Sequence, residues 1–95
     1  MATYIIFSKL SAEGMSDPGE LRQLAETVSK KIKEACPGVQ WKESYAVMGR
    51  FDVVDIVEAD SPAEVEKAAM LIRAYGHAST ETMHATPWKN FLAGL

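Results

Sequence analysis

One four-residue pattern occurs twice in this chain, and it fixes where two helices begin. Asp17-Pro18-Gly19-Glu20 and Ser61-Pro62-Ala63-Glu64 both place a capping side chain before a proline, with a glutamate at the end of the pattern. An aspartate or serine at the N-cap accepts backbone N–H groups of the first turn, where proline is also favoured. The pattern therefore predicts two helices, each entered from an extended segment.

The residues that follow each start support this reading. Apolar side chains recur there at helical spacing, and each stripe ends at residues that suit a helix stop, Cys36-Pro37-Gly38 and Gly76. The stripes are Leu21, Leu24, Ala25, Val28 and Ile32 in the first helix, and Val65, Ala68, Ala69 and Ile72 in the second.

Four segments around these helices are rich in β-branched and aromatic residues or alternate in polarity, which is typical of strands. They are residues 4–10, 39–48, 51–59 and 78–85. Gly49-Arg50 joins the middle two as a hairpin, because short loops with glycine connect antiparallel neighbours. Residues 11–16 are expected to form a loop, and residues 88–93 a short terminal helix after Pro87.

The order of elements is therefore β-α-β-β-α-β, the split unit of the ferredoxin-like sandwich. Right-handed crossovers place both helices on one face of a four-stranded antiparallel sheet. The chain has 95 residues, which suffices for one hydrophobic core, so residues 1–95 are expected to form a single α+β domain.

Charge and cysteine content exclude several classes of protein. The net charge of −3 gives no electrostatic reason to bind nucleic acid or an anionic membrane. Cys36 is the single cysteine, so an intrachain disulfide and a cysteine-rich zinc site are excluded. The apolar run at residues 4–7 is too short for a signal peptide or a membrane span, so a cytoplasmic protein is expected.

A sheet with helices on one side leaves its other face open, and the strands predict that this face is apolar. In the first strand, Ile5 and Phe7 are expected to face the helices, with Tyr4, Ile6 and Ser8 on the open face. In the third strand, both alternating sets are largely apolar. Such a face favours pairing with a second copy of the chain. The alternative is that the terminal segment, with Trp88, Phe91 and Leu92, folds back over it.

The segment Met48-Gly49-Arg50-Phe51-Asp52-Val53-Val54 resembles the GYD domain family, with Gly49, Phe51 and Asp52 at the positions of its turn motif. The likeness extends over nearly the whole chain, although Phe51 stands where the motif has tyrosine. The resemblance implies a ferredoxin-like fold of the dimeric α/β-barrel type. It brings no activity, because members of that fold class include oxygenases, haem enzymes, lyases and ligand sensors.

His84 and Asp55 are the candidate catalytic residues. His84 lies in the fourth strand, which is expected to be a central strand that lines the interior of a dimer, and a histidine titrates near neutral pH. Asp55 lies among apolar neighbours, where a carboxylate needs a partner. The two meet as an acid–base pair if both face the same cavity. The competing interpretation is that each is a structural, hydrogen-bonded group.

Aromatic residues are the candidate ligand contacts. Trp41 and Tyr45 are expected to share one face of the second strand with Glu43 between them, which suits a flat or cationic ligand. Tyr4 and His84 complete the predicted ligand set. Ordinary strand packing also explains these aromatics. Asp52, directly after the turn, is expected to accept turn N–H groups or to pair with Arg50.

Neither a metal nor a cofactor is predicted, because His77 and His84 match no compact ligand spacing. His77 suits the C-terminal end of the second helix, and Cys36 at the end of the first is not expected to be reactive. The sequence leaves three functions open. They are a homodimer that binds a small metabolite between its sheets, a small enzyme using His84 with Asp55 or Tyr4, and a structural or interaction subunit.

Overall fold

The structure is a computed structural model that describes residues 1–12 and 17–95. Its elements follow the predicted order, and the ferredoxin-like α+β fold is confirmed. They are β1 (Ala2–Leu10), α1 (Pro18–Ala35), β2 (Val39–Ala46), β3 (Val53–Ala59), α2 (Pro62–Gly76), β4 (Ala78–Ala85) and α3 (Trp88–Ala93). The loop expected at residues 11–16 falls in part on residues 13–16, which lie outside the described residues.

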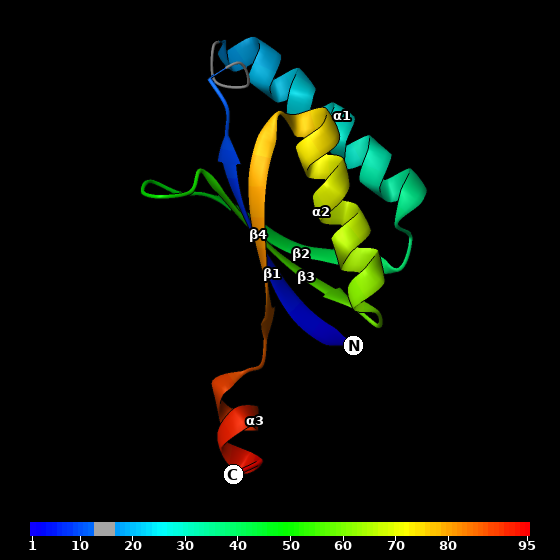
Figure 1. Ribbon diagram of the computed structural model, residues 1–95, viewed down its shortest axis with the longest axis vertical. Coiled ribbons are helices and arrows are strands. Elements are labelled where there is room, and N and C mark those ends of the chain that lie inside the picture. The colour runs from blue at the N-terminus through cyan, green and yellow to red at the C-terminus, as the bar shows by residue number, and fades with distance from the viewer. Residues whose placement is uncertain (13–16) are drawn as a thin grey trace.

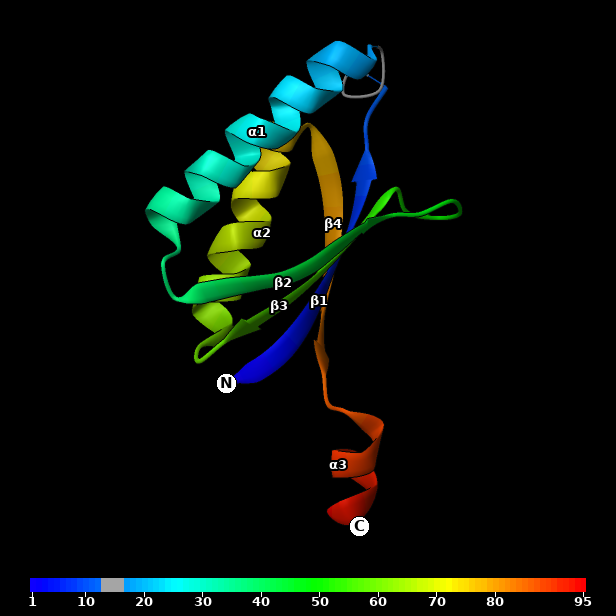
Figure 2. The same ribbon diagram turned by 180° about the vertical axis from the view of Figure 1, so that it is seen from behind.

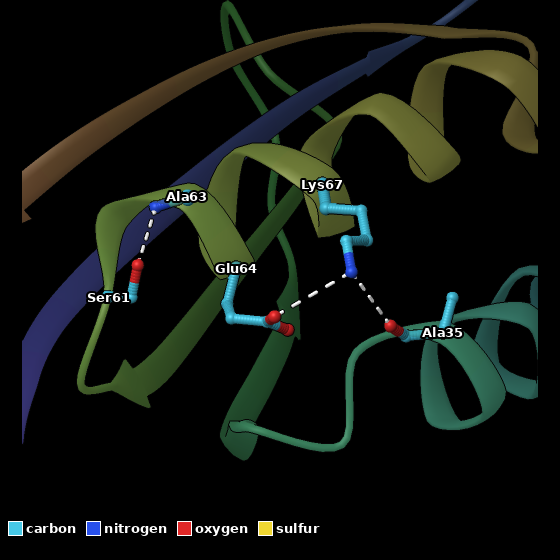
Figure 3. A network of polar contacts seen from close by, with 5 residues as sticks. All are labelled: Ala35, Ser61, Ala63, Glu64 and Lys67. Carbon is cyan, nitrogen blue, oxygen red and sulfur yellow. Dashed lines mark hydrogen bonds and ion pairs between the residues drawn. The ribbon is translucent and has the colours of Figure 1, made fainter.

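Both helix starts form as their sequences indicate. The Asp17 side chain accepts the backbone N–H of Gly19, and the Ser61 side chain accepts that of Ala63. Figure 3 shows the Ser61 cap beside a contact that ties the two helices together. There Lys67 of α2 donates to the carbonyl of Ala35, at the end of α1, and lies 3.6 Å from a carboxylate oxygen of Glu64.

The four strands form one antiparallel sheet in the order β2-β3-β1-β4. Helices α1 and α2 lie on one side of it (Figure 1). The strand order puts β4 at an edge of the sheet, so the expectation that His84 lies in a central strand was wrong. This is the order of the split βαβ unit, in which β3 lies between β1 and β2 and the central strands are β1 and β3.

The core lies between the sheet and α2. Ile6 and Val57 of the central strands and Val65 of α2 are at most 1% exposed, and Tyr4 joins them. This corrects the predicted orientation of β1: Tyr4, Ile6 and Ser8 face the helices, and Ile5 and Phe7 lie on the open face. The alternation was seen correctly. Its phase was assigned wrongly, because both sets contain large apolar residues.

The terminal helix α3 does not cover the open face. Figures 1 and 2 show α3 at the far end of β4, projecting away from the sheet and both long helices. The molecule accordingly measures 47 Å along its longest axis, against 30 and 17 Å along the other two. The fold-back alternative is therefore wrong for a single chain. Within the described residues, no helix has the length and apolar character needed to cross a membrane.

Candidate binding site

A cleft of about 570 Å³ opens between α1 and the helix-facing side of the sheet. It exists because α1 packs on α2, and within the described residues no Cα atom of α1 lies within 8 Å of a strand Cα atom. The apolar stripe of α1 forms one wall through Leu21, Leu24, Val28 and Ile32. Across from this wall, Ser8, Trp41, Ser44 and Asp55 supply polar atoms.

Asp55 is the central polar group of this cleft. It lies on β3 opposite Ile6 and is 7% exposed. One carboxylate oxygen accepts the Trp41 indole N–H at 3.1 Å and the Ser44 hydroxyl at 2.6 Å. Among the described residues, no cationic side chain forms an ion pair with it. Asp55 is thus a buried carboxylate held by neutral donors. Its second oxygen accepts no hydrogen bond from the described residues.

Ser8 adds a second buried polar group to the same cleft. It lies on β1 opposite Val53, two residues along the strand from the partner of Asp55. Its side chain is almost fully buried, and its hydroxyl has no hydrogen-bond partner among the described residues. A buried hydroxyl without a partner costs about 1–3 kcal/mol. Ser8 is therefore a group whose hydrogen-bonding capacity a bound molecule would satisfy.

A β-bulge in β2 lies directly after Trp41 and brings Ser44 into this site. Trp41 lies opposite Val57 and Glu43 opposite Ile56, so Lys42 is an extra residue in the strand. The bulge reverses the alternation, because it shifts the following side chains to the other face. Trp41 and Tyr45 therefore do not share a face, which corrects the prediction. Tyr45 lies on the open face, where its hydroxyl donates to Glu43 and this hydrogen bond raises the pKa of Tyr45.

His84 and Asp55 are not brought together. His84 lies opposite Tyr4 on β4, whereas Asp55 lies opposite Ile6 on β3. These strands flank β1 on either side and are therefore separated by about 10 Å. His84 instead packs edge-on against Tyr4, with ring centroids 5.3 Å apart. Of the candidate pairs, Tyr4 with His84 forms a contact, and Asp55 with His84 does not.

The residues of the turn motif hold the β2–β3 hairpin against β1. Asp52 accepts the backbone N–H of Leu10 at 2.8 Å and lies 3.9 Å from the ammonium of Lys9, so its charged neighbour is Lys9. Phe51 packs on Phe7 with ring centroids 5.0 Å apart. Gly49 has a φ of +152°, a backbone conformation that favours glycine. These geometries describe structural contacts at the hairpin.

Cys36 and His77 occupy the ends of the two long helices. Cys36 is the C-cap of α1 and is 1% exposed, and burial raises the pKa of its thiol. An elevated pKa lowers the thiolate fraction at neutral pH, in agreement with the expected low reactivity. His77 follows α2 with a φ of 50°, the left-handed conformation of a helix C-cap, and its carbonyl accepts the N–H of Ser11.

The opposite side of the sheet carries a continuous apolar strip. Its members come from three adjacent strands that pair in register, and we call them the open-face strip. They are Ile5, Phe7, Val54, Ile56 and Met83. Met83 is 51% exposed, and the other four are half-buried in the isolated chain. A strip of this kind is typical of a surface that packs against another molecule.

A second exposed apolar surface lies on α3. Trp88 and Phe91 stack at a centroid distance of 5.5 Å, yet Trp88 remains 69% exposed. Leu92 and Leu95 are also exposed. The helix has six residues and projects from the end of β4, so its apolar side chains find few neighbours in their own chain.

Sequence reasoning missed the cleft and two of its polar groups, Ser8 and Ser44. A serine among the apolar residues of β1 was a signal for Ser8, because such a residue on a covered face needs a hydrogen-bond partner. No sequence signal indicates that α1 stands away from the sheet. The cleft depends on packing between helices, which local patterns do not encode.

The fold is that of a small ferredoxin-like protein with a cleft on one side of its sheet and an apolar strip on the other. The model of the GYD domain matches residues 4–94, and the chain belongs to this family. A protein of Thermus thermophilus called "Glutamine synthetase and cystathionine beta-lyase binding protein" is 28% identical over 99 residues. That alignment spans 100% of this chain and 99% of the relative.

Solved structures share the fold. TTHA0845 of Thermus thermophilus has a TM-score of 0.60 at 20% identity, covering 92% of this chain and 95% of that one. FFRP-DM1 has a TM-score of 0.58 at 27% identity, and the match covers 90% of this chain and 100% of that one. The hypothetical protein PHS023 of Pyrococcus horikoshii has a TM-score of 0.54 at 21% identity and covers 92% of both chains.

Proposed function

We propose that this protein is a homodimeric binding module in which two copies pack through the open faces of their sheets. The open-face strip is the observation that carries the proposal. It aligns five apolar side chains across three neighbouring strands, on the side of the sheet that neither α1, α2 nor α3 covers. Burying such a strip is worth about 25 cal/mol for each Å² of apolar surface removed from water.

A small metabolite held between the two sheets is a further part of this proposal. Tyr45 and Glu43 are among the polar groups that the open face offers to such a ligand, together with Thr3, Glu58 and Glu81. Tyr4 and Trp41 lie on the helix-facing side of the sheet. These two residues of the predicted ligand set are therefore absent from the interface between the two sheets. The dimer is therefore supported more strongly than a ligand at its centre.

The test is the oligomeric state of a variant that charges the strip. Light scattering of the parent is expected to give twice the 10.4 kDa mass of one chain. Ile56→Glu is expected to give a folded monomer, because a buried glutamate without a partner opposes association. The matched control is Ala74→Glu, at an exposed position of α2. A monomeric parent, or a dimer that survives Ile56→Glu, contradicts the proposal.

A second candidate function is the binding of a metabolic enzyme. The full-length similarity to a relative named for binding glutamine synthetase and cystathionine β-lyase favours it. The exposed apolar surface of α3 is the part of this chain best placed for such contact, since it projects from the body. Aromatic residues of this kind often dominate binding energies at protein interfaces.

This candidate is tested with purified glutamine synthetase from the same source. Comigration in a sedimentation experiment is expected for the parent, and a Trp88→Ala, Phe91→Ala variant is expected to lose it. Met70→Ser, at an exposed position of α2, controls for the loss of an apolar side chain elsewhere. Equal binding by the α3 variant and the parent excludes α3 as the contact, and no binding by the parent removes this partner.

A further inference from the structure

We propose that the cleft between α1 and the sheet binds a small amphipathic amine, with its ammonium group on Asp55 and Ser8 and its apolar body along α1. This site lies on the opposite side of the sheet from the open-face strip. It therefore does not rest on the proposed dimer, and either proposal can fail without the other.

The size and lining of the cleft indicate a small molecule. Its volume of about 570 Å³ falls within the range of about 300–1,000 Å³ that is usual for ligand pockets. Such pockets are mostly apolar with a few convergent polar groups, and this one has the apolar stripe of α1 on one side and Asp55 with Ser8 on the other.

The charge of Asp55 decides the class of ligand. A buried carboxylate is normally paired with a cation, and the described residues provide Asp55 only with the neutral donors Trp41 and Ser44. Both donate to the same oxygen, which leaves the other oxygen for a ligand. An ammonium group satisfies this carboxylate by a charge-assisted hydrogen bond, which is stronger than a neutral one. A carboxylate head group is repelled at this position. Lys33, the one cationic residue among the described residues that line the cleft, lies on α1 and forms no ion pair with Asp55.

Ser8 supports the same assignment independently of Asp55. Its hydroxyl is buried, faces the cleft and has no hydrogen-bond partner in the described part of the chain. A hydroxyl oxygen accepts hydrogen bonds, and an ammonium group has three N–H donors to share between Asp55 and Ser8. The two side chains lie on adjacent strands, β3 and β1, at positions two residues apart in the register. One ligand head group therefore suits both.

Trp41 makes the proposal measurable. It lines the cleft and donates to Asp55, whereas the second tryptophan of the chain, Trp88, is exposed on α3. A Trp88→Phe protein therefore reports on the cleft alone through its tryptophan emission. The probes are 4-phenylbutylamine, 4-phenylbutanol and 4-phenylbutanoate, which share an apolar body and differ in the charge of the head.

The amine is expected to shift Trp41 emission with saturation and to bind at least about tenfold more tightly than the alcohol, the difference expected of a charge-assisted contact. The butanoate is expected to bind most weakly. Asp55→Asn keeps an acceptor for Trp41 and Ser44 and should remove the preference for amine over alcohol. Equal affinities for amine and alcohol in the parent, or no saturable binding of any probe, overturn the proposal.

Two further variants separate binding from stability and from dimerisation. Ser8→Ala is expected to weaken amine binding several-fold while raising the melting temperature, because it removes a buried group without a partner. Ile56→Glu, designed to break the dimer, is expected to leave amine affinity unchanged. Loss of amine binding on Ile56→Glu places the site at the dimer interface and contradicts the location proposed here.

Discussion

The indole N–H of Trp41 donates to the carboxylate of Asp55 across 3.1 Å, although the two residues belong to different strands, β2 and β3. The bulge at Lys42 adds Ser44 to this contact, because it shifts the residues after Trp41 by one position and puts Ser44 opposite Asp55. Ser44 completes the arrangement by donating to the same carboxylate oxygen and accepting from Trp41. A single inserted residue therefore adds Ser44 to the polar wall of the cleft.

Removing the carboxylate of Asp55 is expected to destabilise the fold through its neighbours. Asp55→Ala removes the common acceptor of the Trp41 indole and the Ser44 hydroxyl, and because both residues are exposed and can donate to water, the expected cost is about 0.5–1.5 kcal/mol. Asp55→Asn retains an acceptor oxygen and is expected to lose less. Urea unfolding monitored by tryptophan emission measures both variants. Equal stability of Asp55→Ala and the parent would show that this network contributes nothing.

The phase of β1 yields a second prediction, because Ile5 and Ile6 have similar side chains on opposite faces. Ile6 lies in the core and is 0% exposed. Ile6→Ala is therefore expected to lower the free energy of unfolding by about 2–5 kcal/mol. Ile5 lies on the open face and is half-buried. Ile5→Ala is therefore expected to cost less within one chain. Chemical denaturation measures both, in the Ile56→Glu background so that association does not contribute. A larger loss for Ile5→Ala would reverse the assigned orientation.

The fold could be predicted from the sequence, whereas the positions of the candidate site residues could be predicted only in part. Capping motifs at Asp17 and Ser61 fixed both helices, since these interactions are local. The face of Tyr4 was assigned wrongly because either set of β1 residues is apolar enough to be buried. Trp41 and Tyr45 were placed together because a bulge leaves no clear mark in a strand sequence. Local pattern therefore predicts elements better than it predicts which side chains converge.

Alkylation of Cys36 tests the predicted low reactivity of the thiol. Burial raises the pKa of this group and its side chain is 1% exposed, so iodoacetamide is expected to modify the folded protein much more slowly than the unfolded chain. Mass spectrometry of timed samples, with and without denaturant, measures the two rates. Equal rates would mean that the end of α1 opens freely.

The same pKa shift predicts a dependence of stability on pH. The unfolded chain loses the thiol proton near its ordinary pKa of 9.0, whereas the folded state retains the proton to higher pH. The unfolded state therefore binds fewer protons above about pH 9, and stability falls as pH rises through that range. The contribution is fully present below it. Cys36→Ala is expected to flatten this slope, and an unchanged slope would assign it to other groups.

The last prediction concerns Gly49, in the turn that joins β2 to β3. Its φ of +152° is rarely adopted by residues with a side chain, and a Cβ atom there would meet no atom within 4 Å. Gly49→Ala is therefore expected to destabilise the protein by about 1 kcal/mol through backbone conformation alone. Gly94 has an ordinary φ of −84°, which makes Gly94→Ala the matched control. Thermal unfolding of both separates the two cases, because only the Gly49 variant should melt lower. A neutral Gly49→Ala would mean that the hairpin tolerates another turn conformation, and Asp52, which anchors this hairpin to β1, would then be its main constraint.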